Sequence, residues 1–182
     1  EEVHTVGVFP DIESALDFAE LLQRRMPLYH HDPARLGYQA VVDADDNVEA
    51  LVDRYLGIAS ELSLSEVIDA IHERAGLAIA SHADSSENSV VSQIGFLPDE
   101  PYDAIDLVAP ERLPLTQALD TGSLPIITSS GARRPSRIGA AYIEIDAEAT
   151  EAGDRNSRAQ SAEWLTLLHH TLTSGNYRLH TA

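Results

Sequence analysis

Residues that can do chemistry follow a short apolar run in the middle of the chain. The run Leu77–Ala80 is followed closely by His82 and Asp84. Ahead of it, Ser63 and Glu66 have the spacing of a capping box, and apolar residues then recur at helical intervals up to a glycine. The pattern predicts a helix, a buried strand and a polar strand end. In α/β sheets and barrels, binding and catalytic residues gather at that end.

Histidines at two strand ends are candidate metal ligands. His4 lies in the first apolar stretch and His82 follows the central one. Imidazole nitrogens bind transition metals, but the same histidines can instead form hydrogen bonds with neighbouring loops. Asp84 can orient an imidazole or form a turn. The pairs His30–His31 and His169–His170 are expected at the surface, because adjacent helical residues point about 100° apart and cannot easily face one ion.

A second apolar run leads into an arginine-rich loop. Pro125–Thr128 is followed by Arg133 and Arg134, whose guanidinium groups can hold a phosphate through paired hydrogen bonds. The alternative is a solvated loop that balances an acidic surface. Because strand ends of a parallel barrel meet at one face, we expect His4, His82 and the loop Ser129–Arg133 around a common pocket, within about 12 Å of one another given the strand spacing.

The charge of the chain excludes several functions. All 12 basic residues are arginine, against 30 Asp and Glu, which gives a net charge of -18. Such a chain repels nucleic-acid phosphates, so we expect no broad nucleic-acid surface. The lysine-free, acidic composition indicates either a halophilic source with a salty cytoplasm or a source whose GC-rich genome prefers arginine codons. Because cysteine is absent, any metal site must use His, Asp or Glu.

The length of 182 residues fits one domain. No apolar run approaches the roughly 20 residues that cross a bilayer, and no signal peptide is recognisable, so we expect a cytoplasmic protein without a membrane partner. The chain starts abruptly within a strand pattern, which suggests a piece of something longer.

Alternating strands and helices predict the fold class. We expect strands over 1–9, 77–80, 103–108, 125–128 and 141–145. We expect helices over 11–26, 48–55, 64–75, 115–119 and 159–172, the last of these after an acidic linker over 146–158. This order is typical of an α/β fold with a parallel sheet, either open or closed as a barrel.

Three segments resemble the PHP (polymerase and histidinol phosphatase) phosphoesterases. Glu2–Phe9 is similar to a family strand that carries a metal-binding histidine, here His4, and Gly76–His82 is similar to a later strand that ends in another. Pro125–Arg133 is similar to the terminal motif of the family, which normally reads Ser-Asp-Ala-His. The resemblance implies a distorted (β/α)7 barrel that holds a cluster of divalent metals (Mn, Zn or Mg).

The departures from the family pattern matter as much. In the terminal motif, Gly131 stands where the family has Asp, and Arg133 stands where it has His. The family's His-x-His strand, Asp-His turn and Glu ligand would lie upstream of His4, so we expect a PHP-like barrel that is incomplete at the N-terminus. Of the metal positions that the resemblance implies, His4 and His82 are present. Two histidines cannot hold two or three catalytic metals.

Two functions remain for a single PHP-like domain over 1–182. The first is a degenerate, non-catalytic module for binding or assembly, which recognises a small phosphorylated molecule or a protein partner. The alternative is a metal-dependent phosphoesterase whose N-terminal ligands are missing from this chain. Gly131 and Arg133 favour the first, because no truncation explains them.

The charge yields a prediction that is independent of the family. Excess carboxylates repel one another at low salt, and the Debye length falls from about 10 Å at 0.1 M to about 3 Å at 1 M. Thermal melting should therefore shift to higher temperature as potassium chloride increases over this range. A flat or falling melting temperature would mean that the carboxylates are locally paired or well spread.

Overall fold

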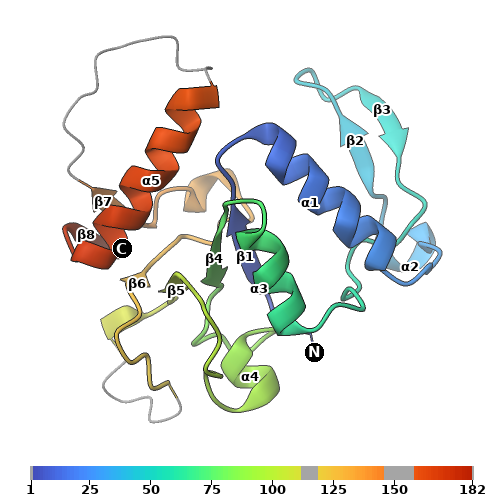
Figure 1. Ribbon diagram of the computed structural model, residues 1–182. Coiled ribbons are helices and arrows are strands. Elements are labelled where there is room, and N and C mark those ends of the chain that lie inside the picture. Colours follow the sequence, from blue (N-terminus) through green and yellow to red (C-terminus); the bar gives the residue numbers. More distant parts are fainter. Residues whose placement is uncertain (1, 112–118, 146–157, 182) are drawn as a thin grey trace. The chain divides into compact units, whose positions relative to one another are not determined.

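The computed structural model describes residues 2–111, 119–145 and 158–181 (Figure 1). The chain forms two compact units, one of Glu1–Ala19 with Ser63–Ala182 and one of Glu20–Leu62. Helix α1 (Ile12–Arg25) runs across the boundary between them. The first unit contains the sheet that carries the predicted site residues, and the second contains a separate hairpin.

A four-stranded sheet forms the centre of the first unit, in the order β1 (Thr5–Val8), β4 (Leu77–Ala80), β5 (Ala104–Asp106) and β6 (Ile126–Ile127). Strands β4, β5 and β6 are parallel, whereas β1 is antiparallel to β4. The expectation of a purely parallel sheet was therefore wrong for β1. The described strands form an open sheet and not a closed barrel, because β1 and β6 lie at opposite edges.

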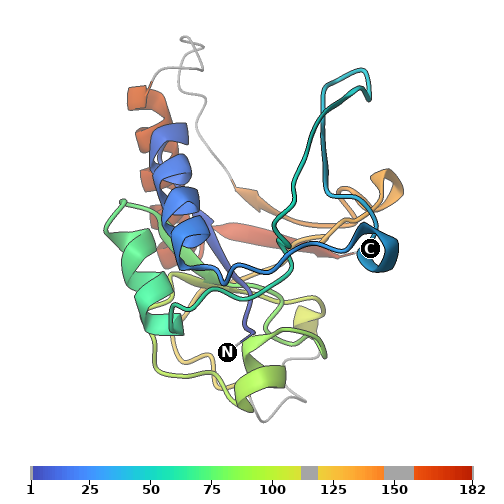
Figure 2. The same ribbon diagram turned by 90° about the vertical axis from the view of Figure 1, so that its right-hand side faces the viewer.

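Strand β4 is buried because α3 packs beside it. Helix α3 (Leu64–His72) begins with the predicted capping box, in which the Ser63 amide donates to the Glu66 carboxylate at 2.8 Å. Its residues Ile68 and Ile71 are fully buried. Figure 2 shows α3 and the C-terminal helix α5 (Arg158–Ser174) on the same face of the sheet.

Helix α5 and a two-stranded ribbon complete the core. Leu172 of α5 packs with Ile79 and Ala104 of the sheet, as the predicted apolar stripe of this helix requires. The ribbon pairs β7 (Ala141–Ile145) with β8 (Tyr177–Thr181) in antiparallel register. Strand β8 and the short helix α4 (Val90–Ile94) were not predicted from the sequence.

Asp103 ties three elements together at the start of β5. Its carboxylate accepts the Ala78 amide of β4 at 2.7 Å and lies 2.8 Å from His72 Nε2 of α3. His169 Nε2 of α5 lies 3.7 Å from the other carboxylate oxygen. His169 and His170 are both exposed, as expected for a surface pair, and His169 also approaches the largely buried carboxylate of Asp103.

The unit Glu20–Leu62 differs most from the sequence-based expectation. It contains α2 (Pro33–Leu36) and an antiparallel hairpin of β2 (Ala40–Val42) and β3 (Val48–Leu51). The helix expected over 48–55 was wrong. The Asp43 carboxylate accepts the amides of Asp45 and Asn47, which makes the turn that folds this segment into a hairpin.

His31 of this unit is buried, contrary to the expected surface position of the His30–His31 pair. His31 is 8% exposed and its ring stacks on Tyr55, whereas the His30 side chain is exposed. The reason is that His30 forms an extended bridge with Arg54, and adjacent residues of extended chain point in opposite directions.

Some expectations fall outside the described residues. The helix expected over 115–119 and the acidic linker over 146–158 lie almost entirely there, and the helix expected over 159–172 corresponds to α5. Within the ranges that the structure describes, no helix combines the length and apolar character needed to span a bilayer.

The position of Asp103 predicts its contribution to stability. Asp103→Ala leaves the Ala78 amide without its acceptor and removes the partner of His72, so it should lower the free energy of unfolding by about 2 kcal/mol in urea denaturation. Asp99→Ala, at an exposed position four residues earlier, is the control and should stay within about 0.5 kcal/mol. Equal effects of the two substitutions would contradict this role of Asp103.

Candidate functional site

The candidate site lies at the carboxyl ends of the three parallel strands. His82 follows β4, Asp106 is the last residue of β5, and Ser129 follows β6. The turn after β4 is fixed by a hydrogen bond from the Ala83 amide to the Asp106 carbonyl at 2.8 Å. His82 has a φ of 43°, an uncommon conformation that histidine adopts more readily than most residues.

The three side chains form one hydrogen-bonded cluster. Ser129 Oγ donates to Asp106 Oδ2 at 2.8 Å and lies 3.3 Å from His82 Nε2. His82 Nε2 also lies 3.3 Å from Asp106 Oδ2. In a catalytic triad the carboxylate and the serine contact different nitrogens of the histidine. Here both meet Nε2 and the serine proton goes to the carboxylate, so this is not a charge-relay arrangement.

Asp106 is the most buried member of the cluster. The residue is 5% exposed, and its Oδ1 atom is buried without a hydrogen-bond partner among the described residues. A buried carboxylate oxygen without a partner is costly, because water no longer solvates it. The cluster therefore keeps one open acceptor position beside His82.

Gly131 packs directly against the ring of His82. It has a φ of +50°, and a Cβ atom added there would lie 2.5 Å from His82 Cε1 and 3.0 Å from Nε2. No side chain fits at this position unless the imidazole moves.

Asp84 and His4 occupy supporting positions at the same end of the sheet. The Asp84 carboxylate accepts the amides of Val108 at 2.7 Å and Ala109 at 2.9 Å, so it fixes the loop after β5 and does not orient an imidazole. The His4 carbonyl accepts the Ser81 amide at 3.1 Å, because antiparallel β1 starts where β4 ends. The His4 side chain is exposed.

The arginine-rich loop continues from Gly131 at the surface. Arg133, Arg134 and Arg137 are all exposed, and the last belongs to a short 3-10 helix, Pro135–Arg137. In the part of the chain that the structure describes, none of the three has an acidic partner within ion-pair distance. Three unpaired guanidinium groups thus follow the residue that packs on His82.

The donors at this site do not fit a cluster of divalent metals. Such a cluster needs several convergent carboxylates and imidazoles. Across the described residues, no three His, Asp or Glu side chains are placed to hold a metal ion together. His82 and Asp106 converge, but a carboxylate at position 131 has no room and the next charged side chain is Arg133.

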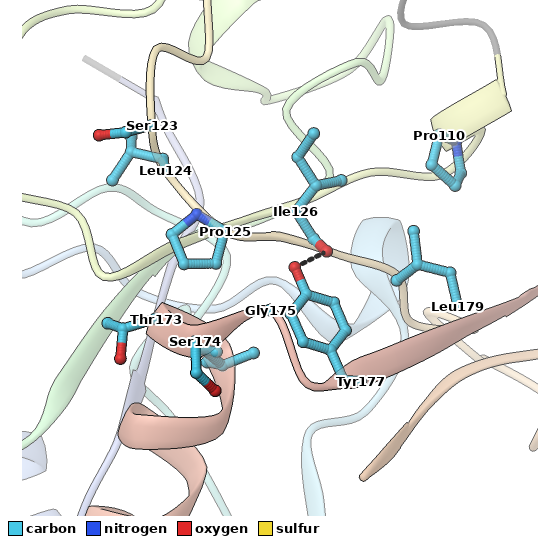
Figure 3. Close-up of a pocket in the computed structure, with 11 residues that line it drawn as sticks. Pro110, Ser123, Leu124, Pro125, Ile126, Thr173, Ser174, Gly175, Tyr177 and Leu179 are labelled. Atoms are coloured by element: carbon cyan, nitrogen blue, oxygen red, sulfur yellow. Dashed lines mark hydrogen bonds between the residues drawn. The ribbon is translucent and has the colours of Figure 1, made fainter.

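A separate cavity of about 550 Å³ lies between α5, β8 and the segment around β6 (Figure 3). Tyr177 Oη donates to the Ile126 carbonyl at 2.8 Å, and burial raises the pKa of Tyr177, so the phenol remains neutral. No charged residue lines this cavity, and none of the predicted site residues does. Its lining therefore offers no carboxylate, imidazole or cationic side chain.

Asp106 was missed as a site residue in the sequence, and Ser129 was expected near His82 only as part of the loop Ser129–Arg133, without a role of its own. Asp106 stands in the strand expected over 103–108, and Ser129 starts the loop chosen for its arginines. The available signal was their position: each lies at the end of an apolar run, as His82 does. Recognising Asp106 required knowing that β5 lies between β4 and β6.

Comparisons with known proteins support the fold. No protein-family model and no curated protein matches the chain. Among solved structures, the chain is similar to the lesion-specific endonuclease PfuEndoQ from Pyrococcus furiosus, with a TM-score of 0.59 at 15% identity. The match covers 98% of this chain and 38% of PfuEndoQ. PfuEndoQ has a PHP fold, so this likeness supports a PHP-like fold for the chain.

The contact between Gly131 and His82 can be tested by adding one methyl group. Gly131→Ala should lower stability by about 1–2 kcal/mol for its positive φ and by about 1–3 kcal/mol more for the contact with the ring. Gly122→Ala is the matched control, since Gly122 has a φ of +54° and nothing within 4 Å of the added atom. Only Gly131→Ala should shift the NMR signals of the His82 ring. Identical losses without a ring shift would show that the contact is unimportant.

Proposed function

We propose that this chain is a non-catalytic, PHP-like binding module that takes a small phosphorylated ligand at the carboxyl ends of β4, β5 and β6. Its sheet would correspond to part of the PHP-like (β/α)7 barrel that the sequence resemblance implies. In this proposal the ligand is an anion held by arginine, and the histidine and aspartate of the site position the loop that carries it.

One observation carries the proposal: the Gly131 backbone occupies the space beside His82. In an active PHP site, an aspartate at this position would help to neutralise the metals. Here any side chain at 131 would meet the imidazole at 2.5 Å. His82 Nε2 instead faces Asp106 and Ser129. The chain thus has glycine where the family motif has Asp, and the His82 ring lies in the space that a larger side chain would need.

The charge of the loop agrees with an anionic ligand. Replacing the Asp and His of the family motif by Gly131 and Arg133 changes the local charge by about +2 before any ligand binds. Arg133, Arg134 and Arg137 have no acidic partners among the described residues, in a chain of net charge -18. A guanidinium group prefers the two oxygens of a phosphate and repels a cation.

A metal-dependent phosphoesterase is the second candidate, and one observation favours it. Asp106 Oδ1 is buried and unpartnered beside His82, and a divalent cation would satisfy it. A site of this kind would use Asp106 and His82 and would need further ligands from elsewhere.

Phosphate titration tests the proposal. Inorganic phosphate should bind in isothermal titration calorimetry, and Arg133→Gln should weaken binding about three- to tenfold, since it removes one charge-assisted hydrogen bond at an exposed position. Arg74→Gln is the charge-matched control. Arg74 lies shortly before the start of β4, at the end of that strand opposite His82, and should leave the affinity unchanged.

A hydrolysis assay separates the two candidates. With Mn²⁺, Zn²⁺ or Mg²⁺, turnover of p-nitrophenyl phosphate and of bis-p-nitrophenyl phosphate should remain at background. Turnover that His82→Ala abolishes would establish the second candidate and overturn the first. If Arg133→Gln and the wild type bind phosphate with equal affinity, the arginine-rich loop is a solvated surface loop and does not hold the ligand.

A further inference from the structure

The hairpin of β2 and β3 is a separate two-stranded sheet. Among the described strands, β2 and β3 pair with each other and with nothing else. Every residue of both strands is exposed. A two-stranded hairpin alone is marginally stable in water, and both its outer edges present unpaired amide and carbonyl groups.

Most exposed side chains of the two hairpin strands are apolar, with Glu49 as the exception. Val41, Val42, Val48 and Leu51 are 45%, 50%, 61% and 59% exposed. Tyr38, just before β2, is 75% exposed. Exposed apolar residues are ordinary when scattered singly, but a group of them on one small element marks an interaction site.

The hairpin is nevertheless well defined. At its tip, Asp43 accepts two amides and the side-chain amide of Asn47, and the hydrogen bond from the Asn47 side chain lowers the pKa of Asp43. At its base, Gln39 Nε2 donates to the carbonyls of Val52 at 3.1 Å and Arg54 at 2.7 Å. The apolar side chains are therefore carried by a hairpin whose tip and base are both fixed by hydrogen bonds.

The charges around this surface determine what can cover it. Segment 37–53 contains the carboxylates Asp43, Asp45, Asp46, Glu49 and Asp53, and no arginine, lysine or histidine. A second copy of the chain would place carboxylates against carboxylates, which opposes association. A partner that has apolar residues flanked by basic ones meets both the apolar surface and its acidic rim.

We propose that the β2–β3 hairpin is a docking surface for an extended segment of a partner protein, in which apolar residues alternate with lysine or arginine. The segment adds a strand to an edge of the hairpin, so its backbone pairs with the free amide and carbonyl groups while its apolar side chains lie beside those of the edge strand on both faces. This inference concerns the unit Glu20–Leu62 and does not depend on phosphate binding at the sheet of the other unit.

A labelled peptide of alternating lysine and valine is the probe. Fluorescence anisotropy should show binding to the full chain, and hydrogen exchange should show new protection of amides within 40–51. A peptide of alternating lysine and glycine has the same charge without apolar side chains, and one of alternating glutamate and valine reverses the charge. Both should bind at least about tenfold more weakly.

A matched pair of substitutions locates the contact. Val41→Thr keeps the β-branched shape that favours a strand and should weaken binding of the lysine–valine peptide about tenfold. Val6→Thr, at a β1 valine that is also 45% exposed, should have no effect. Unchanged exchange in the free Val41→Thr chain would confirm that the hairpin still folds.

Four outcomes overturn the proposal. They are the absence of peptide binding, equal binding by Val41→Thr and Val6→Thr, a dimer in light scattering that Val41→Thr dissociates, and hairpin protection in the free chain that Val41→Thr removes. The third would assign the surface to a second copy of the chain, and the fourth to packing within the chain.

Discussion

Strand β4 lies between β1 and β5 with all four of its side chains buried, and this constraint decides the arrangement of the first unit. Burying Leu77 and Ile79 contributes about 1.5–3 kcal/mol each. The capping box at Ser63 and the carboxylate of Asp103 hold α3 and β5 beside the strand. Once β4 is fixed in this way, the polar residues that follow it must emerge at the sheet edge.

The cluster at that edge is a consequence of neighbouring strands ending at the same level. His82, Asp106 and Ser129 come from three successive parallel strands and satisfy much of one another's hydrogen-bonding capacity. A site that recruits cations leaves its carboxylates and imidazoles free to converge on an ion. In this protein the groups converge on each other and Gly131 packs against the imidazole, while Oδ1 of Asp106 has no partner among the described residues.

Features of the structure that depend on residues close together in the chain could be predicted from the sequence. The capping box, the buried run of β4 and the polar strand ends were readable because each depends on residues close together in the chain. The direction of β1 was not, because alternation of side chains is the same in parallel and antiparallel strands. Val48–Leu51 was predicted as part of a helix because the periodicity of a short apolar run does not distinguish a helix from a strand. The turn made by Asp43 instead folds this segment back as a β-strand.

The contact between Gly131 and His82 was beyond sequence reasoning for another reason. The two residues are separated by two strands and meet only after β5 is inserted between β4 and β6. The sequence shows glycine at position 131, and the structure shows that the His82 ring fills the space that a side chain would need there. His31 gives the converse case, in which a residue with a polar neighbour on each side is buried by an aromatic contact.

The hydroxyl of Tyr177 has a consequence for the solubility of the protein. The carbonyls of Pro125 and Ile127 accept amides from β5, so the carbonyl of Ile126 between them points to the outer edge of β6. The Tyr177 hydroxyl donates a hydrogen bond to that carbonyl. A foreign strand that approached this edge would have to displace a half-buried phenol before it could form a ladder. Among the described residues, Tyr177 thus protects the β6 edge of this mixed sheet against the addition of a foreign strand.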